Sequence, residues 1–202
     1  MIRVLDAPGR QVWLVPGAAP ASFLFVDERA GGILVNTPRY RETLAAALAA
    51  IATVRFIFYP SRHGAADVAQ WREACRARTL AAAEEAADIP GPIDEPIDGA
   101  VRFYGRLDFL PLSGRTRGTC ALRSRAAPGI VFFGPALEHA PWPVLALHED
   151  DFSVENRLIG ALGLREEPFE FAFCDNYIHA LSRFGPGASA AVAAGLAEVL
   201  GA

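Results

Sequence analysis

Residues 54–71 read Val-Arg-Phe-Ile-Phe-Tyr-Pro-Ser-Arg-His-Gly-Ala-Ala-Asp-Val-Ala-Gln-Trp, a strand-like run followed by a polar turn and a helix-like run. β-Branched and aromatic residues dominate Val54–Tyr59, which is typical of a half-buried strand. The proline that follows ends the run, because it has no N–H to donate to a sheet. The alanine-rich segment Ala65–Cys75 predicts a helix. The polar residues Ser61–His63 therefore fall at a strand-to-helix turn, where α/β proteins usually carry their chemistry.

The composition predicts a single domain over residues 1–202. Hydrophobic residues make up 52% of the chain and charged residues 21%, which is enough apolar material for a core and argues against disorder. No apolar run approaches the roughly 18 residues that would cross a bilayer, so no membrane is expected as a partner. The first ten residues contain no apolar segment of signal-peptide length. We therefore expect a cytoplasmic protein.

Charge and cysteine content exclude some classes of function. The net charge of −4 argues against nucleic acid as a partner. All basic side chains of the chain are arginine, so a lysine nucleophile or Schiff base is excluded. Cys75, Cys120 and Cys174 share no CxxC spacing and are interpreted as small buried hydrophobic residues.

The first half of the chain predicts strands followed by alternating helices and strands. Turn compositions separate four short apolar runs, which are typical of an antiparallel meander. Thr37 is a plausible N-cap for a helix with Pro38 in its first turn and Tyr40–Ile51 as its body. The expected strands are Ile2–Leu5, Gln11–Val15, Ser22–Val26, Gly32–Val35, Val54–Tyr59 and Arg78–Ala82.

The second half repeats this order, with strands first and helices last. Residues 84–98 and 138–151 are proline-containing and are predicted to be irregular. Ser153 is expected to cap a helix that runs to about Leu162, and Gly187–Leu200 is expected to be the closing helix. The expected strands are Val101–Tyr104, Arg106–Pro111, Thr119–Arg123, Ile130–Phe133 and Phe169–Cys174. This order predicts an α+β fold, although periodicity alone leaves its arrangement open.

The loop after Tyr59 resembles the Thr-His-x-His-x-Asp-His motif of the metallo-β-lactamase superfamily. In that family, imidazoles and a carboxylate of this loop bind two zinc ions that share a bridging water. The matching run here is Pro60–Ala66, which reads Pro-Ser-Arg-His-Gly-Ala-Ala and retains one histidine. The resemblance implies a four-layer αββα sandwich, with two sheets packed face to face and helices outside.

Three further segments resemble motifs of the family in the right order, over nearly the whole chain. Gly32–Thr37 resembles the strand that ends Leu-Ile-Asp-Thr-Gly, with Asn36 at the aspartate. Leu112–Thr119 resembles Pro-Gly-His-Thr-Pro-Gly-Ser, with Arg115 at the zinc-binding histidine. Ile130–Leu137 resembles Val-Leu-Phe-Thr-Gly-Asp-Ala-Leu, with Pro135 at the bridging aspartate.

The same resemblance implies that most zinc ligands are missing. Asp175 and its neighbours lie where the last Gly-His pair of the family is expected, and they offer no histidine. Sliding the register of the His63 loop brings Asp67 toward a ligand position without restoring the set. We therefore expect no metal and no other cofactor.

His63 and Ser61 are the candidate catalytic residues. The ordinary pKa of histidine lies near about 6.5, so His63 could act as a general base, or as a lone metal ligand. It could equally be a loop histidine bonded to a neighbour. A Ser61–His63 nucleophile lacks the surrounding Gly-x-Ser-x-Gly turn and an identified orienting acid.

The remaining candidates are ligand-binding residues of the same pocket. Arg115 could hold a carboxylate or phosphate bidentately, or it could form an ion pair that closes the pocket. The resemblance places the other four candidates around that pocket: Arg62, Asn36, Asp67 and Asp175.

Side chains outside these motifs carry weaker indications. His139, His148 and His179 share no metal-ligand spacing. His148–Asp151 is a local acidic cluster that could attract a cation, but we expect it to be a solvated loop. Trp142, between two prolines, could serve a lid or an oligomer interface, or pack on the core.

Three hypotheses about function remain at this point. The first is a zinc-free protein of this fold that binds a small-molecule anion, or that acts as an interaction protein or through metal-independent chemistry. The second is a hydrolase with a rebuilt mononuclear zinc site involving His63, Asp67 or Asp175. The third has no pocket and is a structural partner in a homo- or hetero-oligomer. Neither the residues nor the family identify a substrate, because this scaffold serves many reactions.

Overall fold

The computed structural model describes residues 1–165 and 167–201. The chain divides into two compact units, residues 1–97 (unit 1) and residues 98–202 (unit 2). Each unit contains one sheet with helices, so the predicted α+β class is confirmed, whereas the prediction of a single domain stays a prediction. Within the described residues, no helix combines the length and the apolar character needed to cross a membrane.

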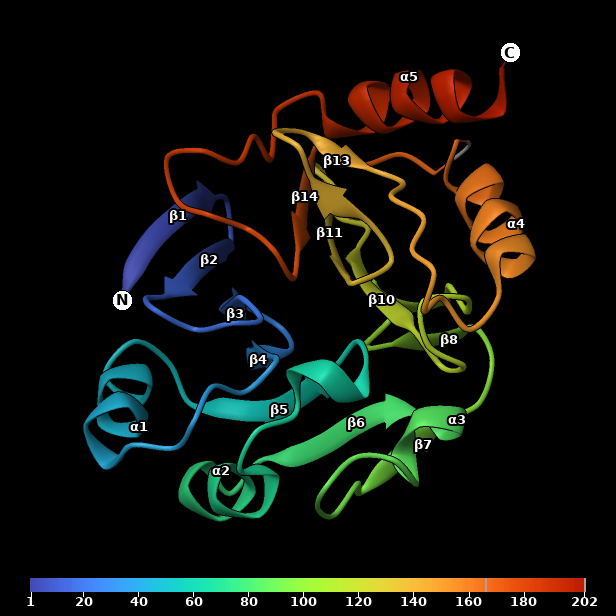
Figure 1. The fold of residues 1–202 in the computed structure, drawn as a ribbon. Coiled ribbons are helices and arrows are strands. Elements are labelled where there is room, and N and C mark those ends of the chain that lie inside the picture. Colours follow the sequence, from blue (N-terminus) through green and yellow to red (C-terminus); the bar gives the residue numbers. More distant parts are fainter. Residues whose placement is uncertain (166, 202) are drawn as a thin grey trace. The chain divides into compact units, whose positions relative to one another are not determined.

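Unit 1 is built on a seven-stranded sheet in chain order from β1 to β7, coloured blue to green in Figure 1. The first four strands pair antiparallel, as the predicted meander requires. From β4 onward the pairing is parallel, because helices connect consecutive strands. The strands are β1 (Ile2–Ala7), β2 (Arg10–Val15), β3 (Ser22–Asp27), β4 (Gly31–Val35), β5 (Val54–Tyr59), β6 (Arg78–Ala82) and β7 (Glu95–Ile97).

The helical elements of unit 1 are α1 (Glu42–Ala49), the 3₁₀ turn η1 (Arg62–Gly64), α2 (Val68–Cys75) and α3 (Ala83–Ala86). Helices α1 and α2 cover one face of the sheet (Figure 1). Leu44 and Leu48 of α1 and Trp71 of α2 enter one apolar cluster with Leu34 and Ile57 of the sheet. Trp71 is fully buried and also donates its indole N–H to the carbonyl of residue 38 at 2.7 Å. The loop after β5 lies at the carboxyl end of this strand, between its neighbours β4 and β6.

Three sequence predictions for unit 1 are wrong in detail. Thr37 does not cap α1; the cap position is Arg41, whose side chain makes no capping hydrogen bond. The second helix begins at Val68 and not at Ala65, because Asp67 adopts a left-handed conformation with φ of 49°. Strand β7 lies inside the segment predicted to be irregular, because the proline at its centre argued against a strand.

Unit 2 contains a five-stranded sheet in the order β14-β11-β10-β9-β8. Strands β8 to β11 pair antiparallel, and β14 adds in parallel to β11. Ser153 caps α4 as predicted, accepting the N–H of Asn156 at 3.1 Å. The elements are β8 (Val101–Phe103), β9 (Leu107–Pro111), β10 (Cys120–Ser124), β11 (Ile130–Gly134), β12 (Glu138–His139), β13 (Pro143–Val144), β14 (Phe171–Cys174), α4 (Val154–Leu164) and α5 (Ala188–Leu200).

Both helices of unit 2 pack on its sheet through one apolar cluster. Ala161 and Leu164 of α4 join Val192 and Leu196 of α5 against buried strand residues such as Phe133. The hairpin of β12 and β13 interrupts the loop predicted over residues 138–151. That hairpin and α4 each supply a residue to the polar groups described below, Glu138 from β12 and Arg157 from α4.

Gly64 is the residue of the β5–α2 loop with the least room. A Cβ atom at this position would lie 1.8 Å from Oδ1 of Asn36, whose residue is 1% exposed. We predict that Gly64→Ala lowers the free energy of unfolding by roughly 1–3 kcal/mol, the usual cost of overpacking. Chemical denaturation of both proteins measures the difference.

A second substitution tests the cause of this loss. Asn36→Gly removes the opposing amide, and glycine tolerates the φ of 58° at that position. In the Asn36→Gly background, Gly64→Ala should cost much less than in the wild type. An undiminished cost would contradict the proposed clash.

Candidate functional site

The turn after β5 carries the predicted catalytic residues Ser61 and His63. Ser61 is fully buried, and its Oγ accepts the backbone N–H of His63 at 3.3 Å. Its hydroxyl therefore acts as the N-cap of the turn η1. The His63 side chain is exposed and lines a cavity of unit 1. The structure thus places these two residues together on one turn, with the serine inside the fold and the histidine at its surface.

Backbone pairing fixes this turn to the end of β4. The N–H of Thr37 donates to the carbonyl of Gly64 at 2.8 Å, and the Thr37 hydroxyl donates to the carbonyl of Ala66 at 2.6 Å. In return, the N–H of Ala66 donates to the carbonyl of Thr37 at 3.3 Å. Asn36 is buried beside this pairing and donates its amide to the carbonyl of Ala21 at 2.9 Å. Two segments that are distant in sequence thus form one rigid wall.

Asp67 and Arg62, both predicted to bind a ligand, have partners within unit 1. Asp67 Oδ2 accepts the backbone N–H of Tyr40 at 2.8 Å. The Arg62 guanidinium forms a short ion pair with Asp88, and its backbone N–H donates to the buried carboxylate of Glu85 at 2.8 Å. These contacts hold the ends of η1 in place.

A cavity of about 610 Å³ lies against this wall in unit 1. Three segments line it: the β2–β3 loop, the chain after β4 and the η1 turn. We call it the arginine cavity, and its lining residues are Pro16, Gly17, Ala18, Ala19, Pro20, Thr37, Pro38, Arg39, Arg41, His63, Ala65 and Ala66.

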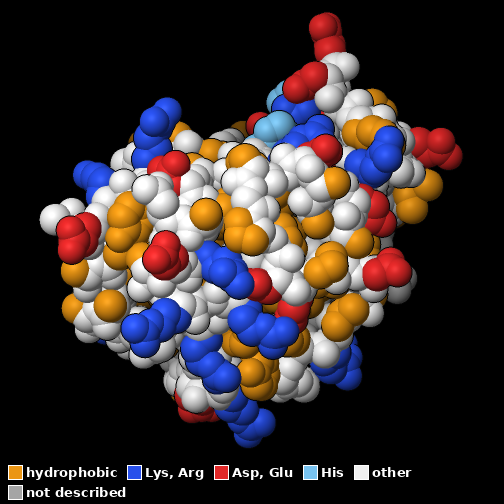
Figure 2. Space-filling model, turned by 90° about the horizontal axis from the view of Figure 1, so that it is seen from below, with side chains coloured by type: hydrophobic (Ala, Val, Ile, Leu, Met, Phe, Trp, Pro, Cys, Tyr) orange, Lys and Arg blue, Asp and Glu red, His pale blue; other side chains and the backbone are white. Residues whose placement is uncertain are grey.

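The side chains of the arginine cavity carry only positive charge. Arg39 and Arg41 are exposed, and within residues 1–165 and 167–201 neither guanidinium forms an ion pair with a carboxylate. Other arginines of unit 1 do have acidic partners, for example Arg72, which binds Asp94 through two nitrogens. On the face drawn in Figure 2, arginines are likewise interspersed with carboxylates. The cavity differs, because no Asp or Glu is among its lining residues.

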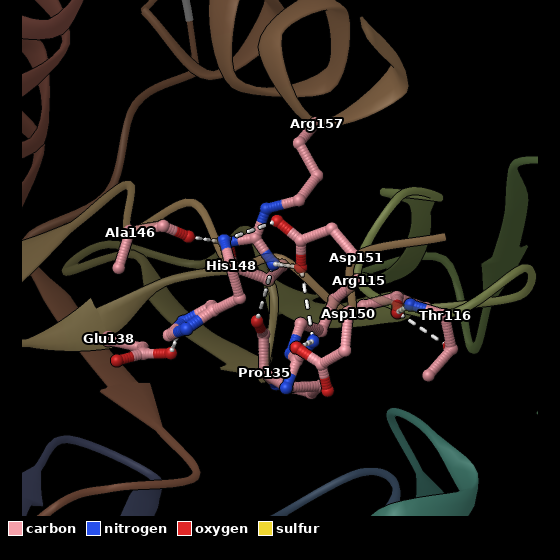
Figure 3. Close-up of polar contacts among 11 residues, drawn as sticks. Arg115, Thr116, Pro135, Glu138, Ala146, His148, Asp150, Asp151 and Arg157 are labelled. Carbon is pink, nitrogen blue, oxygen red and sulfur yellow. Dashed lines mark hydrogen bonds and ion pairs between the residues drawn. The ribbon is translucent and has the colours of Figure 1, made fainter. Parts of the chain in front are cut away.

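In unit 2, Arg115 is held by two neighbouring carboxylates (Figure 3). Its guanidinium lies 2.6 Å from Asp150 Oδ1 and 3.2 Å from Asp151 Oδ1. The hydrogen bond to Asp150 raises the pKa of Arg115. The Arg115 side chain is 18% exposed, whereas the carboxylate of Asp151 is completely buried. Of the two alternatives given for Arg115, the contacts of its guanidinium match the ion pair.

Arg157 of α4 is the centre of the same cluster, and the sequence analysis did not identify it. Its side chain is 2% exposed and lies 3.2 Å from Asp151 Oδ1. Figure 3 shows it descending from α4 to the carbonyls of Pro135 and Ala146, and it also donates to the carbonyl of Ala136 at 3.3 Å. Burial lowers the pKa of Arg157, an effect that Asp151 opposes. One guanidinium thus connects α4 with two loops of unit 2.

The other predicted residues of unit 2 each have different surroundings. His148 Nε2 lies 2.5 Å from Glu138 Oε1, so the residue predicted to lie in a solvated loop forms a half-buried pair. His139 is buried against Tyr177, with ring centroids 5.4 Å apart, and His179 is exposed. Asp175 follows β14 and donates its N–H to the carbonyl of Gly134 at 3.0 Å.

The cysteines and Trp142 behave as core or near-core groups. Cys120 and Cys174 are buried and Cys75 is half-buried, all as free thiols. Burial raises the pKa of Cys75 and of Cys174, which keeps both thiols protonated. Trp142 packs against the apolar cluster of unit 2, with the Arg183 guanidinium 6.0 Å from its ring centroid.

The residues present at the motif positions do not fit the dinuclear zinc site of the family that the sequence resembles. In unit 1, the motif positions hold one imidazole beside a buried hydroxyl and two methyl groups, and in unit 2 they hold Arg115 and Pro135. Within the part of the chain that the structure describes, no three His, Cys, Asp or Glu side chains are grouped to hold a metal ion. A zinc site needs at least three such ligands, so no step of a mechanism is derived through zinc.

Two features of this site escaped the sequence analysis for different reasons. Arg39 and Arg41 directly follow the segment that resembles the family's Asp-Thr-Gly turn, so their position was a usable signal. Arg157 lies in an ordinary amphipathic helix, 42 residues after its neighbour Arg115 in the cluster. Only the tertiary fold brings those two arginines to the same aspartate.

The buried position of Arg157 predicts a large effect on stability. Arg157→Gln should lower the free energy of unfolding by roughly 3–5 kcal/mol, because it leaves the buried carboxylate of Asp151 with less compensation. Arg165→Gln is the matched control, since Arg165 is an exposed residue at the end of the same helix. Urea denaturation compares the variants. An equal, small effect of both substitutions would contradict the assigned role of Arg157.

The burial of His139 predicts a dependence of stability on pH. Burial lowers the pKa of His139 below its ordinary value of about 6.5, so the folded state binds fewer protons than the unfolded state just below that pH. Stability should therefore fall as pH drops through about 6.5 toward the folded pKa. The melting temperature of wild type should decrease more between about pH 7.5 and about pH 5.5 than that of His139→Gln. Equal decreases would exclude His139 as the cause.

Comparison with known proteins relates the geometry to solved structures. No family model and no curated protein sequence matches the chain. The metallo-beta-lactamase SMB-1, solved with mercaptoacetic acid, superposes with a TM-score of 0.67 and 14% identity, over 96% of this chain and 92% of that chain. The subclass B3 enzyme BJP-1 of Bradyrhizobium japonicum gives a TM-score of 0.63 and 12% identity, over 94% and 89% of the two chains.

A longer protein aligns with a higher score. The metallo-beta-lactamase from Staphylococcus aureus subsp. aureus COL has a TM-score of 0.71 and 9% identity, over 95% of this chain and 63% of that chain. At such low identity these similarities establish the fold and nothing about activity. The chain therefore has the metallo-β-lactamase fold, as the sequence motifs predicted.

Proposed function

We propose that this protein binds a small-molecule anion in the arginine cavity of unit 1, without a dinuclear zinc site. The observation that carries the proposal is the composition of the cavity lining, which contains two arginines and a histidine and no Asp or Glu. Thr37 adds a hydroxyl to the same wall, although it already donates to Ala66. Guanidinium groups bind carboxylates and phosphates through paired, charge-assisted hydrogen bonds.

The charge of the whole chain makes this cavity unusual. The protein carries a net charge of −4, so a local concentration of positive groups opposes the overall field. Such a concentration attracts anions, and the attraction weakens with ionic strength. Arg39 and Arg41 are available for it, because they form no ion pair with a carboxylate among the described residues.

The two arginines of the cavity are not the two that were predicted from the sequence to bind an anion. Arg62 and Arg115 were expected to bind the anion, and both are engaged by carboxylates within their own units. A bound anion would have to displace Asp88 from Arg62, or Asp150 and Asp151 from Arg115. Arg39 and Arg41 require no such displacement. A mononuclear hydrolase built on His63 and Asp67 is less supported, because Asp67 accepts the N–H of Tyr40.

Anion binding should depend on the cavity arginines. Isothermal titration of wild type with phosphate and with malonate, at constant ionic strength, is expected to give saturable binding. Arg39→Gln and Arg41→Gln should each weaken binding about ten-fold or more, since a hydrogen bond to a charged group contributes roughly 1.5–3 kcal/mol. Arg29→Gln is the matched control, because Arg29 is an exposed arginine of unit 1 outside the cavity.

A substitution of His63 tests the part played by its side chain, which lines the same cavity. His63→Gln should weaken the binding of phosphate and of malonate at constant pH, because the amide cannot become positively charged. The effect should be smaller than that of Arg39→Gln, since the arginine always carries its charge. If phosphate and malonate do not bind, or if they bind equally well to Arg39→Gln, the proposed function is wrong.

A separate prediction is that the protein does not bind zinc tightly. Purified protein that has been exposed to excess zinc and then dialysed should retain less than one ion per chain by elemental analysis. The reason is that the motif positions offer one imidazole in unit 1, while Arg115 in unit 2 carries a positive charge that repels a cation. One or more tightly held zinc ions per chain would favour the mononuclear hydrolase instead.

A further inference from the structure

We infer that the ligand of the arginine cavity is an organic anion with an apolar body, such as an alkyl or aryl phosphate or carboxylate, and not a free inorganic ion. This inference rests on the proposed anion-binding function and adds the chemical class of the ligand. It follows from how charged and apolar groups are distributed over the three segments that line the cavity.

The β2–β3 loop forms an apolar part of the lining. Its residues Pro16–Pro20 include two prolines and two alanines, and none of them has a side chain that can form a hydrogen bond. The loop is held at both ends, because Val15 pairs with Ser22 and the carbonyl of Ala21 accepts the amide of Asn36. An inorganic ion would gain nothing from such a surface, whereas an alkyl or aryl group would.

The chain after η1 adds apolar residues to the lining. Ala65 and Ala66 line the cavity after His63, at positions where the sequence resemblance places an aspartate and a histidine. Ala65 also belongs to the apolar cluster of unit 1, and Ala66 is half-buried. Their methyl groups offer no ligand to a cation and no hydrogen bond to an oxyanion. The pairing of Thr37 with Ala66 fixes their position relative to Arg39. A ligand whose head group is held by the arginines therefore meets apolar surface with the rest of its body.

The volume of the cavity agrees with a ligand larger than a phosphate ion. The cavity measures about 610 Å³, within the range of roughly 300–1,000 Å³ that is usual for small organic ligands. One water molecule occupies about 30 Å³ in the liquid, and a phosphate ion replaces only a few of these. The absence of Asp and Glu from the lining also argues against an amine on the ligand.

Titration calorimetry with three probes tests the inference: inorganic phosphate, phenyl phosphate and benzyl alcohol. Phenyl phosphate should bind roughly ten- to one-hundred-fold more tightly than phosphate, because its ring leaves water for the apolar lining. Benzyl alcohol, which has the ring without the charge, should not bind measurably. Arg39→Gln should weaken binding of both phosphates, which ties the result to this cavity.

A variant of the apolar loop locates the ring. Ala18→Leu enlarges a half-buried side chain of the lining and takes up room in the cavity. It should remove most of the preference for phenyl phosphate over phosphate, because a larger side chain in the apolar part of the lining occupies the space that the ring would need. A thermal melt of Ala18→Leu confirms that the variant is folded.

The outcomes separate this inference from the proposed function. Equal binding of phosphate and phenyl phosphate, both weakened by Arg39→Gln, would overturn the apolar body and leave the anion site standing. A preference for phenyl phosphate that survives in Ala18→Leu would also overturn it, because the ring would then lie elsewhere. Failure of both phosphates to bind, or binding that is unaffected by Arg39→Gln, would refute the anion site itself.

Discussion

The pairing of Thr37 with the η1 turn is the interaction on which the architecture of unit 1 around the cavity depends. Three hydrogen bonds join the chain after β4 to the chain after β5, two from backbone N–H groups and one from the Thr37 hydroxyl. The hydroxyl of the buried Tyr59 lies 3.4 Å from the Thr37 oxygen and completes the contact. The pairing continues the parallel register of the two strands beyond the sheet and so joins the two loops directly. Arg39 and His63 are held on opposite members of this pair.

The same pairing explains where the sequence analysis succeeded and where it did not. The strand Val54–Tyr59 and the meander before it were predictable, because their apolar patterns match the pleat of a sheet with helices on one face. The helix start at Thr37 was not, because a threonine before a helix-forming run is an equally good cap or strand extension. Its hydroxyl bonds to a carbonyl 29 residues away, and no local rule anticipates that contact.

In unit 2, the loops are joined in a different way, by the guanidinium of Arg157. A metal ion would join loops through ligands that must lose protons, and its binding would depend on pH. Arg157 instead joins α4, the chain after β11 and the chain before α4 through directed N–H donors. Since all basic residues of the chain are arginine, such contacts persist over any pH at which the carboxylates are ionised. Local patterns could not reveal this, because a buried arginine in a helix has no sequence signature.

The complete burial of Ser61 bears on how this site relates to its metal-binding counterparts. Ser61 stands where the resemblance places the first histidine of the motif, and its small side chain is enclosed by the fold while it caps η1. Gly64 leaves equally little room on the other side of the turn, because a Cβ atom there would meet Asn36. A Ser61→His substitution would therefore do two things at once: it would add an imidazole, and it would remove the hydroxyl that caps the turn carrying His63. In this chain, the residue that could become a ligand is already part of the support of the loop.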